Sequence, residues 1–181
     1  MLYVVGGYIV RGVTYLDNIM YVVCGGSYRI SLYNTDTFCP LDVVINVYGM
    51  RDAPDMVVCC DDRQLYVADI DCIWRVSVDS HTYVKWLTLE SVTDVRSLSL
   101  TSRRLLVTSS GWSPGRTSTT RTVSQYNTTD RQLLRVIEMQ GYVMDVLHSV
   151  ETTSGTFIIT SEDAVSELFR LCRLVKYCII S

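Results

Sequence analysis

The sequence predicts an all-β fold: a β-propeller of four-stranded antiparallel blades that repeat about every 46 residues. Three observations predict it. Apolar segments recur along the 181 residues at a nearly regular spacing. Within these segments apolar and polar residues alternate, as they do in half-buried strands. Polar turn sequences separate the segments, and no helical pattern of 10–15 residues lies between successive strands.

Three sets of segments show the repeat. The first set covers residues 20–23, 65–68, 105–108 and 157–160, which begin 45, 40 and 52 residues apart. The second set consists of alternating segments centred on Ser31, Ser77 and Ser124, which lie 46 and 47 residues apart. The third set ends at Gly49 and Gly141, 92 residues or two periods apart. Their agreement indicates a repeated structural unit.

Each period predicts four short strands. In the second period these are residues 55–60, 64–68, 73–78 and 84–89. Trp74 and Val76 share one face of the third of these strands, and Arg75 points to the other face. The blade-like periods span residues 13–49, 54–90, 94–141 and 143–170, within a single domain or fragment over residues 1–181. Apolar residues at helical spacing follow residue 165, so residues 165–181 are predicted as either a C-terminal helix or an imperfect last blade.

The second period resembles an NHL repeat. Residues 54–79, PDMVVCCDDRQLYVADIDCIWRVSVD, follow that family's order of a proline-led strand, a turn, an "IYVAD"-like strand and an "RI-V" strand. The segments YVVGG at residues 3–7 and YVVCGG at residues 21–26 are similar to kelch repeats. Both families are β-propellers, and the NHL or six-bladed TolB-like group is preferred, with a resemblance that covers about residues 13–160.

This resemblance implies that the chain is short, and it favours an incomplete ring. NHL-type propellers usually close with six blades, whereas the periods here account for about four. Three alternatives remain open: a fragment or truncated gene product, a compact four-bladed ring, or half of an oligomeric ring. An open arc leaves two uncovered ends, so self-association through open propeller edges is one expected contact.

The composition excludes several classes of protein. The 16 basic and 19 acidic residues give a net charge of −3, so no basic field favours nucleic acid. The seven cysteines include no CxxC pair, which argues against a zinc ribbon or a disulfide scaffold and favours reduced thiols. No signal-peptide pattern and no apolar run of membrane-spanning length is present, so we expect a cytoplasmic protein that does not contact a membrane.

The sequence predicts no catalytic residue, metal site or cofactor. His148 and Asp145 lie three positions apart on a predicted strand, so they point to opposite faces and do not form a catalytic pair. Asp69 and Asp71 share a face and offer oxygens for a hard cation, but no third ligand follows at the spacing of an ion loop. The alternative function is a metal-dependent hydrolase or lactonase of the six-bladed kind.

Propeller geometry predicts where a partner binds. Loops between second and third strands share one rim with the connections between blades, and these segments are residues 25–28, 69–72, 109–121, 49–53, 90–94 and 140–142. The predicted rim residues are Arg51, Asp52, Asp69, Asp71, Trp112 and Arg116. Residues 109–121 are predicted as an irregular insertion, with Trp112 either tucked against the blade or exposed as an anchor. The predicted function is a non-catalytic protein-interaction module; an NHL-type RNA-binding face is disfavoured by the acidic charge.

Overall fold

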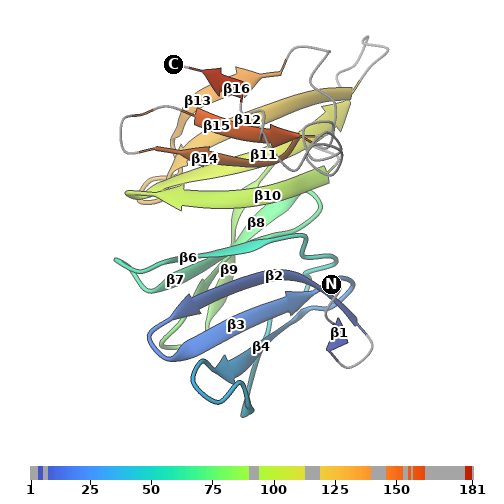
Figure 1. Cartoon of the computed structure of the whole chain (residues 1–181), viewed down its shortest axis with the longest axis vertical. Helices are drawn as coiled ribbons and strands as arrows, with labels where there is room; N and C mark the ends of the chain where they lie inside the picture. Colours follow the sequence, from blue (N-terminus) through green and yellow to red (C-terminus); the bar gives the residue numbers. More distant parts are fainter. Residues whose placement is uncertain are drawn as a thin grey trace, which may run out of the picture. The chain divides into compact units, whose positions relative to one another are not determined.

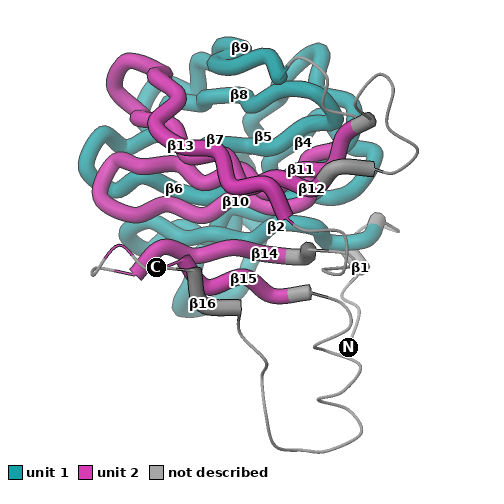
Figure 2. The backbone as a smooth tube through the Cα atoms, turned by 90° about the horizontal axis from the view of Figure 1, so that it is seen from above, with its two compact units in different colours: residues 1–90 teal, residues 91–181 magenta. Residues whose placement is uncertain are grey.

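The computed structural model describes residues 4–5, 8–89, 94–112, 119–139, 146–152, 155, 157–161 and 178–180. These residues form four antiparallel sheets, in agreement with the predicted all-β fold (Figure 1). The chain divides into two compact units, Met1–Glu90 and Ser91–Ser181, each of which contains two of the sheets (Figure 2). None of the described residues belongs to a helix that has the length and hydropathy to cross a membrane.

The first unit contains two sheets whose strands follow chain order. The first sheet consists of β1 (Val4–Val5), β2 (Tyr8–Leu16), β3 (Ile19–Cys24), β4 (Arg29–Asn34) and β5 (Pro40–Asn46). The second consists of β6 (Met56–Cys59), β7 (Gln64–Ala68), β8 (Cys72–Ser77) and β9 (Tyr83–Thr88). The four strands predicted for the second period are therefore confirmed to within one residue at each end.

The second unit also contains two sheets. Its first sheet consists of β10 (Asp94–Thr101), β11 (Arg104–Trp112), β12 (Thr119–Asn127) and β13 (Leu133–Glu138). The last sheet consists of β14 (Val146–Glu151), β15 (Phe157–Ser161) and β16 (Cys178–Ile180). Of the C-terminal segment, residues 178–180 form a strand that pairs with β15, while the predicted choice between helix and strand for residues 165–177 lies outside the described residues.

The insertion predicted at residues 109–121 was wrong in its extent. Strand β11 continues through Ser109, Ser110 and Gly111 to Trp112, and β12 begins at Thr119, with Trp112 opposite Thr119 in the register. The serine and threonine residues extend the hairpin because each paired residue satisfies its backbone polar groups across the ladder. Gly111 does not interrupt the strand.

The predicted repeat matches the positions of the strands within the sheets. If the two-residue β1 is left out of the count, the first strands of the four sheets are β2, β6, β10 and β14, and residues of the first set lie in the second strands, β3, β7, β11 and β15. The second set lies in the third strands, β4, β8 and β12, and the third set begins in the outer strands β5 and β13. Equivalent residues of different sheets follow directly from this alignment, with Met20 matching Leu65, Leu105 and Phe157.

A shared turn joins the third and fourth strands in three sheets. Its fifth residue has a positive φ and donates its backbone N–H to the carbonyl of the first residue, as seen in Phe38 to Asn34 (2.9 Å), His81 to Ser77 (3.0 Å) and Arg131 to Asn127 (3.0 Å). The first residue also caps the turn through its side chain. Asn34 Oδ1, for example, accepts a 2.9 Å hydrogen bond from the N–H of Asp36.

The core of the first unit lies between its two sheets. Tyr21, Val23 and Ile30 cover the first sheet's side of this interface, and Leu65 and Val67 lie on the second sheet's side. We call the face of a sheet that contacts the next sheet along the chain its trailing face, and the face that contacts the previous sheet its leading face.

The first strands of these two sheets approach each other closely. A Cβ atom added to Gly12 of β2 would lie 2.7 Å from the backbone N of Met56 in β6 and 2.9 Å from Val23 Cγ2. A side chain at this position would displace backbone rather than a flexible group, so the contact between the two strands requires glycine.

The second unit packs its two sheets in the same sense but through a more polar interface. Its apolar core is the cluster Leu106, Val123, Phe157 and Ile159. Beside it lies the buried Glu151, which accepts hydrogen bonds from Gln125 Nε2 at 2.7 Å and from Arg104 at 3.2 Å. The hydroxyls of Thr108 and Ser149 are 2.7 Å apart. These pairings satisfy polar groups that burial would otherwise destabilise.

Candidate functional site

Three connecting segments of the first unit meet at one end of its sheets. They are residues 25–28 between β3 and β4, residues 47–55 between β5 and β6, and residues 69–71 between β7 and β8. The N–H of Val47 donates to the carbonyl of Tyr28 at 2.8 Å, and the N–H of Gly26 donates to Asp52 Oδ1 at 2.9 Å. We call residues 25–28, 47–53 and 69–71 the loop rim. The prediction that these loops share a face is confirmed for this unit.

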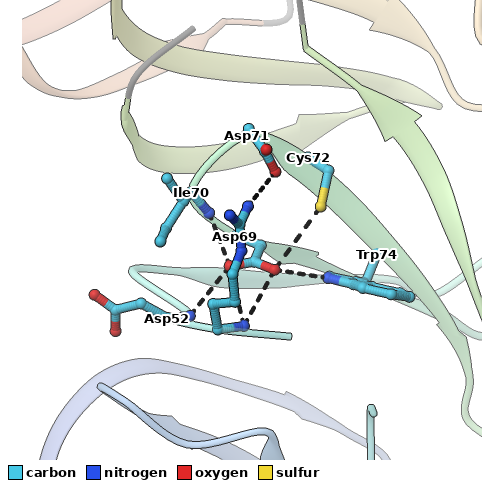
Figure 3. Close-up of polar contacts among 7 residues, drawn as sticks. Asp52, Asp69, Ile70, Asp71, Cys72 and Trp74 are labelled. Carbon is cyan, nitrogen blue, oxygen red and sulfur yellow. Dashed lines mark hydrogen bonds and ion pairs between the residues drawn. The ribbon is translucent and has the colours of Figure 1, made fainter. Parts of the chain in front are cut away.

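Asp69 is the central side chain of the loop rim (Figure 3). It has no exposed surface, and its Oδ1 accepts hydrogen bonds from the N–H groups of Ile70 at 2.8 Å and Asp52 at 3.1 Å. The N–H of Arg51 lies 3.2 Å from Oδ2, which also accepts a 3.0 Å hydrogen bond from Trp74 Nε1. Both oxygens are therefore engaged by donors of the chain itself, and the carboxylate holds the loop rim in place.

Local chemistry explains the position of this carboxylate. Asp69 follows the last residue of β7, and its own N–H donates to the carbonyl of Cys72 at 2.8 Å to close the turn into β8. An aspartate at the start of a tight turn accepts from nearby backbone N–H groups, as Asp69 does from Ile70. Asp69 also accepts hydrogen bonds from Arg51 and Asp52 in the connection between β5 and β6, so it both caps its own turn and holds a segment distant in the sequence.

Arg51 and Asp71 form an ion pair on the outer side of the loop rim. The hydrogen bond from Arg51 lowers the pKa of Asp71 and raises that of the guanidinium. The side chains remain 52% and 42% exposed, so water and salt screen the pair and it adds little to stability. Both charges are accessible to a partner.

Two tyrosines form the apolar part of the loop rim. The rings of Tyr28 and Tyr48 are stacked, with centroids 5.6 Å apart and an interplanar angle of 28°. They are 39% and 65% exposed, and the guanidinium carbon of Arg29 lies 5.4 Å from the centre of the Tyr28 ring. Sequence reasoning did not single out either tyrosine. The available signal was that Tyr28 is the last residue of one loop predicted to lie on the rim and Tyr48 directly precedes another.

Four of the six predicted site residues come together: Arg51, Asp52, Asp69 and Asp71. For Trp112 the structure describes the backbone, at the end of β11, but not the side chain. Arg116 lies outside the described residues, as do residues 90–93 and 140–142 of the predicted connections. Whether the second unit has a corresponding rim therefore stays a prediction.

The two histidines of the chain belong to different units. His81 occupies the positive-φ position of the turn between β8 and β9, with φ of 56°, and His148 lies in β14 of the other unit. Asp145 is outside the described residues. In the part of the chain that the structure describes, no group of three His, Cys, Asp or Glu side chains is arranged to hold a metal ion.

The sequence matches no protein-family model and no curated protein. Solved structures are similar in fold. One is a nidogen/laminin complex, with a TM-score of 0.64, 12% identity and a match that covers 85% of this chain and 57% of that one. Another is the β-propeller domain of Myceliophteria thermophila Cps50 (Swd1), with a TM-score of 0.60, 12% identity and coverage of 86% and 50%.

These neighbours are β-propellers, so the predicted propeller fold is confirmed. The chain spans about half the length of the two solved chains it matches.

Proposed function

We propose that this chain is a non-catalytic protein-interaction module that binds a protein partner through the loop rim. The observation that carries the proposal is the stacked, exposed pair Tyr28 and Tyr48, which lies on the same rim as the exposed Arg51. Tyrosine and arginine, like tryptophan, are enriched among the residues that contribute most to binding at protein interfaces, because they combine a large contact surface with polar groups.

The rigidity of the loop rim supports this role. Asp69 fixes the backbone of residues 51 and 52, and Asp52 in turn fixes Gly26. A surface that is already ordered loses little conformational entropy on binding, so more of the contact energy appears as affinity. Loops held on a rigid sheet scaffold are a common location for recognition.

The chemistry of the loop rim defines the partner in outline. The tyrosine pair suits an aromatic or aliphatic side chain, and the adjacent Arg51 and Asp71 suit polar groups at the edge of the contact. One structural neighbour was solved as a complex of nidogen with laminin, which is consistent with a propeller that serves as a protein-binding scaffold. The net charge of −3 favours a protein over RNA.

We also propose a subgroup of propellers for this chain and a location in the cell. We infer an NHL-like member of the propeller group from the motif at residues 54–79. We infer a cytoplasmic location from the free thiols of Cys24, Cys39, Cys59, Cys60 and Cys72. Trp112 remains a proposed second anchor in the other unit. The use of Asp69 as an internal hydrogen-bond acceptor supports a non-catalytic role over the metal-dependent hydrolase or lactonase alternative.

Crosslinking tests the binding surface. A photoreactive phenylalanine at position 48 should capture a protein partner in cells, and the same probe at Phe38 should not, although Phe38 is 70% exposed in the turn between β4 and β5. Binding of the identified partner should fall about tenfold or more in Tyr28→Ala and Arg51→Ala. Equal binding by these variants, or a thermal shift of several degrees with calcium or zinc, would overturn the proposal.

A further inference from the structure

The leading face of the first sheet is apolar, and solvent reaches much of it. Val13 is 52% exposed, Tyr15 71% and Val44 44%, while Val22 at the centre is 4% exposed. The register places these side chains on one face, because Val13 pairs with Val22, Val22 with Ser31, and Ser31 with Val44. A face with several large apolar side chains exposed together is typical of an interaction surface.

Comparison with the second sheet indicates that the leading face of the first sheet is suited to contact with another sheet. Alignment of Met20 with Leu65 also matches Val22 with Val67, and the register then matches Val13 with Met56. In the second sheet these equivalents are buried: Leu65 and Val67 have no exposed surface, and Met56 is 1% exposed. They belong to the apolar core between the first and second sheets. The leading face of the first sheet therefore has apolar residues at positions that, in the second sheet, are buried against a neighbouring sheet.

The last sheet presents the complementary face. Its trailing face carries His148, Val150, Ile158 and Thr160, because Ile158 pairs with Val150 and Thr160 with His148. Val150 is 40% exposed and Ile158 is partly exposed. The equivalents of Ile158 and Thr160 in the previous sheet are Leu106 and Thr108, which are 0% and 1% exposed and lie on the face that contacts the last sheet.

We propose that a second copy of this chain covers the leading face of the first sheet, with the trailing face of its own last sheet. Trailing face against leading face is the contact that both units already form internally, so the assembly extends an existing interface. The match covers 57% and 50% of the two solved chains, so two copies of this chain together have about the length of one of them. The contact is heterologous, since each copy contributes a different surface.

One residue sets the strength of this contact. A register shift in the first strand of three sheets is followed by Gly12, Ser97 and His148, at equivalent positions of the trailing face. Gly12 and Ser97 lie on trailing faces that a following sheet covers, and Gly12 has no space for a Cβ. The larger imidazole of His148 keeps the incoming strand further away, so the self-association is weak and reversible.

Sedimentation equilibrium of the full chain tests the proposal. Wild type should pass from 20.5 kDa to twice that mass as concentration rises. Tyr15→Arg, in the leading face, and Val150→Arg, in the trailing face, should each stay monomeric, while Phe38→Arg, a control with the same exposure as Tyr15, should associate like wild type. His148→Ser should tighten the association about tenfold.

Mixing the two blocked variants decides the geometry. Tyr15→Arg retains an intact trailing face and Val150→Arg an intact leading face, so the mixture should form a one-to-one dimer although neither associates by itself. Circular dichroism confirms that each variant is folded. A monomer at every concentration, or a Val150→Arg protein that dimerises by itself, would overturn the head-to-tail contact.

Discussion

The indole Nε1 of Trp74 donates a 3.0 Å hydrogen bond to Oδ2 of Asp69, a carboxylate with no exposed surface. Trp74 lies in β8 and belongs to the core between the first and second sheets, while Asp69 holds the backbone of the connection between those sheets. One carboxylate thus joins the apolar core to the loop rim. The loop rim keeps its shape because this side chain is both buried and fully hydrogen-bonded.

Asp69→Asn should reduce the free energy of unfolding by about 2–3 kcal/mol, because the amide NH₂ would face N–H donors and leave buried polar groups unsatisfied. Urea denaturation measures the change. Asp71→Asn is the matched control: its side chain is 42% exposed in a screened ion pair, and we expect a loss below about 1 kcal/mol. Equal losses in the two variants would show that Asp69 does not hold the connection.

Gly12→Ala should destabilise the first unit by about 2 kcal/mol or more, since the new Cβ would lie 2.7 Å from the backbone N of Met56. Gly26→Ala serves as a comparison because its φ is 69° and its Cβ would meet no atom within 4 Å. We expect a cost of about 1 kcal/mol there, from backbone strain. A thermal melt of the two variants should rank Gly12→Ala as less stable.

His81→Gly should stabilise the protein by up to about 1 kcal/mol, and His81→Val should destabilise it by about 1–2 kcal/mol. The reason is the φ of 56°, which glycine adopts freely and a β-branched residue adopts poorly. Arg131, with φ of 64° in the equivalent turn, should respond in the same order. Denaturation midpoints that did not follow the order glycine, wild type, valine would contradict the role assigned to this turn.

Cys72 should make the protein less stable in alkali. Burial, together with the nearby charge of Asp69, raises the pKa of this thiol from 9.0 to about 12. Between these values the unfolded thiol ionises while the folded one stays protonated, so its contribution is complete below pH 9.0 and falls as the pH rises toward 12. The unfolding free energy of wild type should therefore decline more steeply over this interval than that of Cys72→Ala.

Alkylation provides an independent check on this thiol. Cys39 and Cys60 are exposed and should react with iodoacetamide in the native protein, whereas the buried Cys72 should react after unfolding. Peptide mass spectrometry resolves the three sites. Labelling of Cys72 at the rate of Cys60 in the native protein would contradict its burial.

Much of the fold was predictable because strand formation depends on alternation over a few residues. The segment from Ile73 to Val78 alternates in sequence, and β8 lies at Cys72–Ser77. The extent of the hairpin around Trp112 was not predictable from Gly111 and the serines, because those residues are compatible with both loop and strand. Pairing with β12 selects the strand.

The sequence by itself determined the period, the four strands of the second period and the loops that share a rim in the first unit, since these follow from local patterning and its repetition. The tertiary structure decided that Asp69 is buried while Asp71 is exposed, and that Tyr28 stacks on Tyr48. It also decided that the apolar leading face is covered in the second sheet and faces solvent in the first. The physical reason is that burial and pairing depend on residues from neighbouring strands and sheets, as in the contact of Arg51 with Asp69 across 18 positions of the sequence.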